Sequence, residues 1–343
     1  MVIGFTIGSS LILPPGRDLQ SKAWMAILLG LLEGLIFIAI FTTITQKMKK
    51  KSFLTILTEV FGNIFGKILY FLFTIYCFHV GSLVLRNFMD FISITMMPAT
   101  PIFAIGLAVL VATAYAAYHG IGAIGRNSEI LVPLTFIAVA ITVLLLYKDM
   151  KIDYFKPFFE VKLKELLTAS HSTATFPFGE TVVFLYMLPY VIDPSKTRKS
   201  MSLGVIYGTS IILIAVVRNI AVLGIRASVA TYPSAQAVRL INIANVITRL
   251  EVIIFFNLLT MGFIKACVLL WGSTMGFTQL LKIDNHRKLV VPVAIAMLFV
   301  ATYQFQNVME NVLFAKVYPI YAPIFQVGIP VLTLIVAKIR KLI

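Results

Sequence analysis

The chain alternates between long apolar runs and short polar segments along its whole length. Most of the runs have about 20 residues, the length that an α-helix needs to cross the hydrocarbon core of a bilayer. We therefore expect ten transmembrane helices. Their approximate ranges are 1–14, 24–45, 68–91, 102–118, a fifth helix ending near 147, 168–193, a seventh helix ending near 224, 250–275, 289–303 and 318–338.

The first and the sixth of these helices are interrupted. The interruptions are Gly8-Ser9-Ser10 in the first helix and Phe176-Pro177-Phe178-Gly179-Glu180 in the sixth. Proline removes a backbone donor and glycine loosens the chain, so both disrupt the hydrogen-bond ladder of a helix. Broken backbone at membrane depth is tolerated only where it is buried in protein or lines a cavity. We therefore expect a ligand site at these two interruptions.

Each interrupted helix is the first in a group of five, which is typical of inverted-repeat transporters. The predicted fold is an all-α polytopic membrane protein with a LeuT-like five-plus-five inverted repeat, forming a single domain over residues 1–343. The first repeat covers about 1–147, an outer loop covers 148–166, and the second repeat covers about 167–340. The first helix has roughly 13 residues where about 20 are needed. We expect the native chain to start further upstream, or this start codon to be misassigned.

Composition and charge also indicate a membrane protein. Of the 343 residues, 59% are hydrophobic and 13% are charged, whereas a soluble domain has about 25% charged residues. The formal net charge of +15 comes from short basic clusters between apolar runs, such as Lys47–Lys51. This pattern predicts cytoplasmic loops, with both chain ends inside, and excludes nucleic-acid binding. The bilayer is the partner that the composition predicts.

The sequence shows no constellation typical of an enzyme. Cys77 and Cys267 both lie inside apolar runs, without a disulfide framework or a metal-binding spacing. No Ser/His/Asp set and no phosphate-binding loop is present. We expect a protein without catalytic activity, metal or cofactor.

Two further segments are predicted to be helical without crossing the membrane. Ser52–Lys67 is amphipathic and is expected along the inner membrane surface. Arg226–Arg249 is a long outer segment, which we expect to be partly helical and to fold over the site as a lid.

The two interruptions offer complementary groups to a zwitterionic ligand. The half-helix after Gly8, Ser9 and Ser10 presents free N–H groups and the positive end of its dipole, which suits a carboxylate. The outer half of the sixth helix ends near Phe176 with free carbonyl groups, which suit an ammonium group. The alternative interpretation is that these small residues serve helix packing alone.

Glu180 is the deepest acidic residue of the predicted bundle. An ionised carboxylate at this depth costs at least about 2.5 kcal/mol, so it must be paired, hydrated or protonated. Three roles remain open: partner of a ligand ammonium group, protonation switch, or hydrogen-bonded anchor of the interruption. Phe176 and Phe178 either wall the ligand site with Pro177 and Gly179 or simply pack.

Other polar residues inside the apolar runs are weaker candidates. His79 is a candidate lining residue or a buried, hydrogen-bonded histidine, and Glu33 and Glu251 are candidates for a proton or polar network with Glu180. Arg86 and Asp90 have the i, i+4 spacing of a helical ion pair, expected near the outer surface. Arg218 and Lys265 are interpreted as residues near helix ends that extend to the membrane surface.

Several motifs together resemble one known family. They are Ile7–Pro14, Leu85-Arg86-Asn87-Phe88 with Pro98–Pro101, His119-Gly120-Ile121 with Gly125-Arg126 and Glu129, and above all Phe176–Glu180. The chain thereby resembles the GerAB-type B subunits of spore germinant receptors, within the amino acid–polyamine–organocation superfamily. The resemblance implies a subunit in the inner membrane of the dormant spore. It also implies recognition of a small germinant, often an amino acid, together with A-type and C-type subunits.

Two functions are compatible with the predicted fold, because fold alone does not decide function. The first is a receptor that binds a germinant and signals to partner subunits. The second is a proton- or sodium-coupled amino acid transporter, which needs a site for the coupling ion. In this type of fold that site often lies between the first interruption and the eighth expected helix, 250–275. Val246–Leu259 offers no convincing ion site, although Thr248 and Asn257 supply oxygens, so the sequence favours the receptor.

Overall fold

The computed structural model describes residues 1–48, 51–241 and 251–343, and these residues are helical or irregular, with no strand. The long helices are α2 (Ala23–Lys47), α4 (Asn63–Thr95), α5 (Ile102–His119), α6 (Ile121–Leu146), α8 (Thr197–Leu223), α11 (Glu251–Leu280) and α12 (Arg287–Tyr303). The shorter ones are α1 (Val2–Ile7), α3 (Phe53–Phe61), α7 (Leu163–Thr173), α9 (Arg226–Val229), α10 (Pro233–Arg239), α13 (Val308–Phe314), α14 (Tyr318–Pro323) and α15 (Ile329–Ile339).

Seven helical segments among the described residues are long and apolar enough to cross a membrane. The other three expected crossings are shorter or interrupted: Val2–Leu11 is a ten-residue helix, α7 is separated from η6 (Gly179–Tyr190) by η5 (Ala174–Phe178), and α12 has 17 residues. The count of ten crossings therefore stays a prediction.

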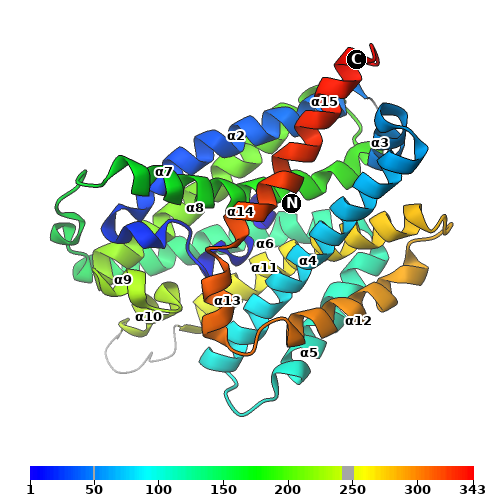
Figure 1. Ribbon diagram of the computed structural model, residues 1–343. Helices are drawn as coiled ribbons and strands as arrows, with labels where there is room; N and C mark the ends of the chain where they lie inside the picture. The colour runs from blue at the N-terminus through cyan, green and yellow to red at the C-terminus, as the bar shows by residue number, and fades with distance from the viewer. Residues whose placement is uncertain (49–50, 242–250) are drawn as a thin grey trace.

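α11 forms the centre of the bundle. It packs against α1, α4, α5, α6 and α12, and against both η1 (Gly8–Leu11) and η6. Every residue of its middle part, from Ile264 to Met275, is buried. α11 therefore contacts both interrupted helices at once, and Figure 1 shows it passing behind α4 through the middle of the bundle.

The two ends of the bundle carry different short elements. α3 and the end of α15 lie together at one end, where the Arg340 guanidinium donates to the carbonyl oxygens of Glu59 and Val60 (Figure 1). α9 and α10 lie at the opposite end. The expected amphipathic segment ends earlier than predicted, because Gly62, with φ +86°, separates α3 from α4. α3 buries its apolar side, including Phe53 and Leu57, as an interfacial helix does.

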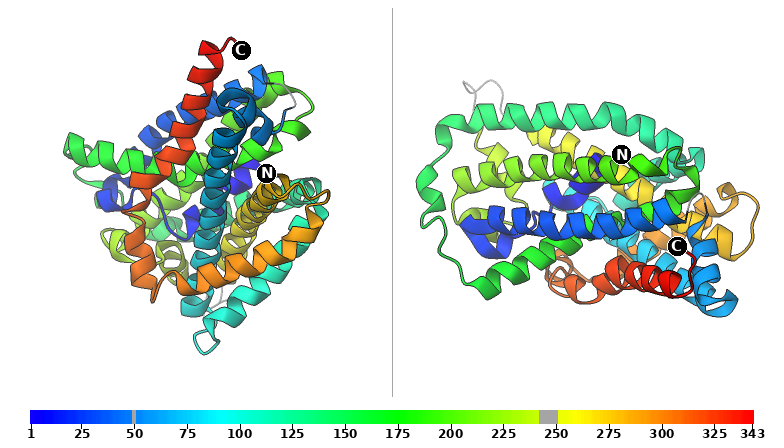
Figure 2. Two further views of the ribbon diagram at one scale, coloured as in Figure 1. Left: turned by 45° about the vertical axis from the view of Figure 1, so that its right-hand side comes forward. Right: turned by 90° about the horizontal axis from the view of Figure 1, so that it is seen from above.

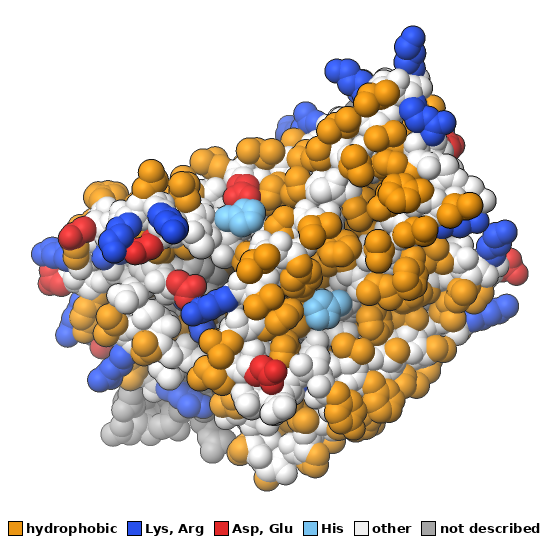
Figure 3. All heavy atoms as spheres, viewed as in Figure 1, with side chains coloured by type: hydrophobic (Ala, Val, Ile, Leu, Met, Phe, Trp, Pro, Cys, Tyr) orange, Lys and Arg blue, Asp and Glu red, His pale blue; other side chains and the backbone are white. Residues whose placement is uncertain are grey.

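The surface matches a bundle that is embedded in lipid. Apolar side chains cover a broad band across the face shown in Figure 3, and charged side chains gather mainly at its two ends. The exposed large hydrophobic residues include Ile36 on α2, Leu144 on α6 and Val111 on α5. An apolar surface of this extent faces lipid in a membrane protein.

Candidate functional site

The first helix breaks at Gly8, as the sequence predicts. Gly8 has φ +25°, a conformation that favours glycine. The side chain of Lys265 on α11 packs directly against it, so a Cβ at this position would overlap that side chain. Ser9 and Ser10 are buried, and the Ser10 hydroxyl donates to the carbonyl oxygen of Thr6. The small residues at this break therefore admit a protein side chain.

The sixth helix breaks at Phe176, where the backbone is extended with φ −132° and ψ 113°. Pro177 follows and lacks an N–H group to continue the ladder. The carbonyl oxygen of Thr175 instead accepts a hydrogen bond of 2.9 Å from Nε2 of Gln326. A Cβ on Gly179 would overlap the same amide. Gln326 thus occupies one carbonyl that we expected a ligand ammonium group to use.

Glu180 and Lys265 form an ion pair that joins the two breaks. Both side chains are buried, with 3% and 0% of their surface exposed. The Lys265 ammonium group also lies 4.7 Å from the ring centre of Phe176 and 5.3 Å from that of Phe5 on α1. These are cation–π distances. The prediction that Lys265 extends to a membrane surface is wrong, because it lies at the middle of α11 and is held by Glu180.

A chain of hydrogen bonds ends on the carboxylate of Glu180. The hydroxyl of Tyr318 donates to Oε1 at 2.8 Å, and it lies 2.9 Å from the hydroxyl of Tyr76. Because a phenol has only one O–H donor, Tyr76 must donate to Tyr318. Nε2 of Gln326 in turn donates to the Tyr76 oxygen at 2.7 Å. Every donor in this chain is directed toward Glu180, so its Oε1 has a hydrogen-bond partner inside the bundle.

A cavity of about 340 Å³ reaches Glu180 of this ion pair, and we call it the vestibule. Its walls come from the segment after η1, from α4, from α7 and from the connection between α13 and α14. The lining residues are Leu13–Asp18, Leu83, Val84, Asn87, Thr168, Ser172, Phe176, Glu180, Asn311, Val312, Phe314, Ala315, Lys316, Tyr318 and Pro319. A volume of this size suits a small ligand.

Of the predicted site residues, the vestibule is lined by Phe176 and Glu180. The vestibule is not lined by the other predicted residues of the two breaks: Gly8, Ser9, Ser10, Pro177, Phe178 and Gly179. Phe178 is buried and packs against Gly34 of α2. His79 packs against the rings of Phe314 and Tyr321, at 5.9 and 6.0 Å between ring centres.

The predicted polar network separates into two parts. Among the described residues, Glu33 does not contact Glu180. Its Oε1 instead lies 2.7 Å from Nδ1 of His171 on α7. Glu251 begins α11, and its side chain lies outside the described residues, as do Thr248 and the side chain of Asn257.

Arg86 and Asp90 form the predicted ion pair, at 2.8 Å, and both side chains are buried near the C-terminal end of α4. The Arg86 guanidinium also donates to three carbonyl oxygens at the end of α12, where the helix dipole is negative. Asp90 accepts from Nδ2 of Asn311, which also donates to Asn87. Asn87 and Asn311 line the vestibule, so this network positions two of its polar walls.

Arg218 is also fully buried, so the prediction that it extends to the membrane surface is wrong. Its guanidinium donates to Thr142 Oγ1 at 2.5 Å and to Asn219 Oδ1 at 2.8 Å. The Asn219 amide then donates to Ser234 on α10. These contacts join α6, α8 and α10 at the outer end of the bundle.

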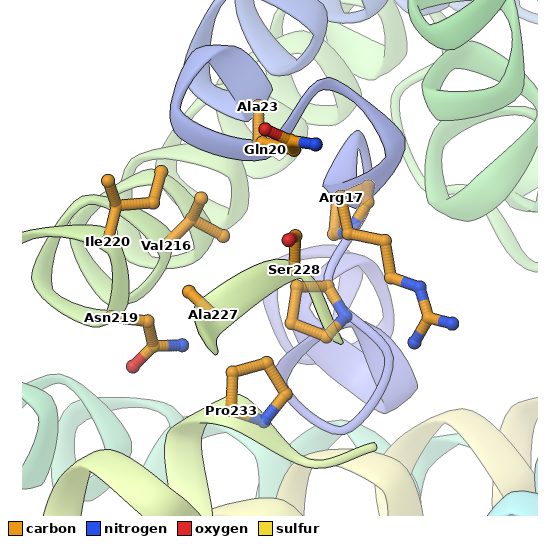
Figure 4. A pocket seen from close by; sticks show the side chains of 11 residues that line it. Arg17, Gln20, Ala23, Val216, Asn219, Ile220, Ala227, Ser228 and Pro233 are labelled. Carbon is orange, nitrogen blue, oxygen red and sulfur yellow. The ribbon is translucent and has the colours of Figure 1, made fainter. Parts of the chain in front are cut away.

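The outer segment that we expected to form a lid borders a different space. Ala227, Ser228 and Pro233 line a cleft of about 20 Å³, together with residues of α8 and of the segment before α2 (Figure 4). Such a volume holds about one water molecule. None of the described residues 226–241 lines the vestibule, and residues 242–250 lie outside the described part.

The fold and the site together define a class. The interrupted helices meet at a buried ion pair below a vestibule, and the overall fold matches the crystal structure of MhsT in complex with L-phenylalanine. The TM-score is 0.69 at 14% identity, over 98% of this chain and 96% of that one. This confirms the LeuT-like fold of an integral membrane protein.

The chain belongs to the spore germination protein family, whose model matches residues 1–309. It is 26% identical to spore germination protein KB of Bacillus subtilis (strain 168), over 99% of this chain and 93% of that protein. It is 23% identical to spore germination protein B2 of the same organism, over 88% and 84%.

Sequence reasoning missed four residues of the site: Lys265, Tyr318, Tyr76 and Gln326. For Lys265 a signal was present, since an uninterrupted apolar run with one lysine at its middle has no nearby surface for the charge. The tyrosines and Gln326 carry no comparable signal, because membrane helices contain such residues for many reasons.

Proposed function

We propose that this chain is the ligand-binding B-type subunit of a spore germinant receptor in the spore inner membrane. A small germinant, an amino acid, enters the vestibule and binds next to Phe176 and Glu180, which line it. The observation that carries the proposal is that Glu180, the acidic member of the buried ion pair with Lys265, lines the vestibule. Membership of the spore germination family supports the receptor context.

The ion pair supplies both charges that a zwitterion needs. An amino acid that reaches the pair can place its ammonium group on Glu180 and its carboxylate on Lys265. No charge is then left unpaired in the low-dielectric interior, where an unpaired charge is costly. The proposed site thereby discriminates zwitterions from ligands that carry one charge only.

The same exchange gives a route for a signal. Glu180 belongs to η6 of the interrupted sixth helix, and Lys265 belongs to the central α11. When the ligand separates Glu180 from Lys265, the ion pair between η6 and α11 is lost, and the two elements change their relative position. Such a change in the membrane is passed to A-type and C-type partner subunits.

The second candidate function is an amino acid transporter coupled to protons or sodium. The Lys265 side chain fills the space beside Gly8, between the first break and α11. A fixed ammonium group there disfavours a second cation by charge repulsion. We therefore expect germinant binding to be the same in sodium and in choline buffers. That result would argue against sodium coupling. A proton-coupled mechanism would instead show transport of labelled amino acid that follows a pH gradient.

The proposal is tested by ligand binding to the purified chain in lipid nanodiscs. Each of the common L-amino acids and glucose is added, and the melting temperature and the heat of binding are measured. A ligand at 100 times its Kd stabilises the folded state by about 2.7 kcal/mol. Stabilisation by one or a few amino acids is the expected result. A chain that binds none of them contradicts the proposal.

A further inference from the structure

The ion pair of Glu33 and His171 lies at the surface of the bundle and within the depth of the membrane. Glu33 is ten residues beyond the start of α2 at Ala23, which places it about 15 Å along the helix. Trp24 marks the outer boundary, as aromatic residues at membrane interfaces do. His171 is eight residues beyond the start of α7, about 12 Å along it. Both residues therefore lie within a hydrocarbon core of about 30 Å.

The pair is partly exposed to the outside of the bundle. His171 has 43% and Glu33 has 31% of its side-chain surface exposed. Neither residue lines the vestibule. Glu33 uses Oε1 and His171 uses Nδ1 within the pair. Among the residues that the structure describes, the other carboxylate oxygen and Nε2 have no hydrogen-bonding partner in the chain.

The surroundings of the pair are apolar and more exposed than the pair itself. On α7, Leu163, Leu167 and His171 follow one another at i, i+4 spacing, and both leucines are exposed. On α2, Leu32 and Ile36 flank Glu33, with about 60% of each exposed. Glu33 and Ile36 on α2, and Leu163, Leu167 and His171 on α7, have the spacing of three or four residues that places side chains next to each other on a helix. α2 and α7 pack against each other.

A polar pair in this position is unfavourable against lipid. Ionisable groups within a membrane span almost always face a bundle interior or a water-filled cavity, or pair with another group. Here Glu33 and His171 satisfy each other only in part, and neither residue lines the vestibule. Small and polar side chains across a helix interface supply the missing hydrogen bonds in membranes.

We propose that the stripe formed by Leu32, Glu33, Ile36, Leu167 and His171 is the docking surface for a transmembrane helix of another subunit. The helix that fits it carries a donor side chain at the same depth: Asn, Gln, Lys or Arg. A second copy of this chain fits less well, because a two-fold contact brings two Glu33 carboxylates together. The inference rests on the proposed function in one respect, namely that the receptor contains a partner subunit.

The test uses photo-crosslinking residues placed at Leu32 and at Leu167 in the full chain, in native spore membranes. The matched control is Ile137, which is 53% exposed on α6. Ile137 is nine residues before the end of α6, at a similar depth, and α8 separates α6 from α2 (Figure 2). The crosslinked peptides are identified by mass spectrometry.

We expect both probes in the stripe to react with the same transmembrane segment of one other protein, and the Ile137 probe not to do so. That segment carries an Asn, Gln, Lys or Arg within one turn of the crosslink. In the double variant Glu33→Leu/His171→Leu the crosslink yield falls by about tenfold, as expected when an interhelical hydrogen bond is lost. Crosslinks to lipid only, to a second copy of this chain, or equally from Ile137 overturn the proposal.

A second measurement separates a docking role from a folding role. The melting temperature of the purified double variant is expected to equal that of the unaltered chain, because leucine at a lipid-exposed position costs little. A clear loss of stability shows that the pair serves the fold and overturns the proposal. Germinant binding by the purified chain is independent of this surface, so the proposed function and the docking surface fail separately.

Discussion

The side chain of Lys265 lies against Gly8, and its ammonium group reaches Glu180 across the space between the two interrupted helices. One lysine at the middle of α11 therefore contacts both breaks. It supplies the positive charge that a membrane-buried carboxylate needs. The interrupted helices and the central helix form one electrostatic unit at the floor of the vestibule.

Replacing Lys265 is expected to destabilise the fold. Lys265→Met keeps a similar volume and leaves Glu180 as an unpaired buried charge, which costs about 3–5 kcal/mol of unfolding free energy. Thermal melting in nanodiscs measures the loss. Lys282→Met, at an exposed position, is the control and changes stability by less than about 0.5 kcal/mol. The double variant Lys265→Met/Glu180→Gln recovers part of the loss, and equal melting of all three proteins contradicts the ion pair.

The two glycines at the breaks are expected to tolerate no larger side chain. Gly8→Val places its branched side chain on Lys265, and Gly179→Val places it on the amide of Gln326. Both variants are expected to lose germinant binding while they remain in the membrane. Gly125→Val is the control, because no neighbouring atom lies within 4 Å of a Cβ there. A normal binding curve for Gly8→Val or Gly179→Val refutes the prediction.

Substitutions of Glu180 separate its possible roles. Glu180→Gln keeps an acceptor for the Tyr318 hydroxyl but removes the charge opposite Lys265. Glu180→Ala removes both interactions. The Gln variant leaves Lys265 unpaired and removes the proposed partner of the ligand ammonium group, so it is expected to lose the response. The Ala variant also loses the Tyr318 contact and is expected to be expressed more poorly than the Gln variant. A Gln variant that responds as the unaltered chain does shows that Glu180 only anchors the break. Expression and dose–response are compared side by side, and a well-expressed Gln variant that no longer responds assigns the charge to the ligand.

The hydroxyl of Tyr318 is expected to contribute measurably, unlike that of its neighbour Tyr321. Tyr318→Phe interrupts the chain of donors that ends on Glu180 and lowers stability by about 1 kcal/mol. The Tyr321 hydroxyl has no hydrogen-bond partner among the described residues, so Tyr321→Phe is the matched control. The melting temperatures of the two variants check this. Equal shifts show that the donor chain has no special role.

The orientation in the membrane is tested by cysteine labelling. Lys199→Cys, in the first turn of α8, is expected on the inner side, and Lys162→Cys, just before α7, is expected on the outer side; both side chains are exposed. A membrane-impermeant maleimide added to intact vesicles of known orientation labels only one of them. The reverse labelling pattern means that the charge bias was assigned the wrong sign.

The sequence by itself determined the membrane class, the main helices and both breaks. These follow from local rules: an apolar run of about 20 residues crosses a bilayer, and proline or glycine ends a helical hydrogen-bond ladder wherever it occurs. The prediction of Phe176–Glu180 as the central break is confirmed for this reason, as is the LeuT-like fold. The Arg86–Asp90 pair also follows from a local spacing.

Only the tertiary structure decided which distant residues meet. Glu180 pairs with Lys265, Gln326 caps Thr175, and Glu33 pairs with His171 rather than with Glu180. Each of these contacts joins helices that are far apart along the chain, and no local pattern specifies the partner. The depth and rotation of each helix, set by packing against its neighbours, placed Lys265 in the core. The same packing left the Glu33–His171 pair partly exposed at the surface of the bundle.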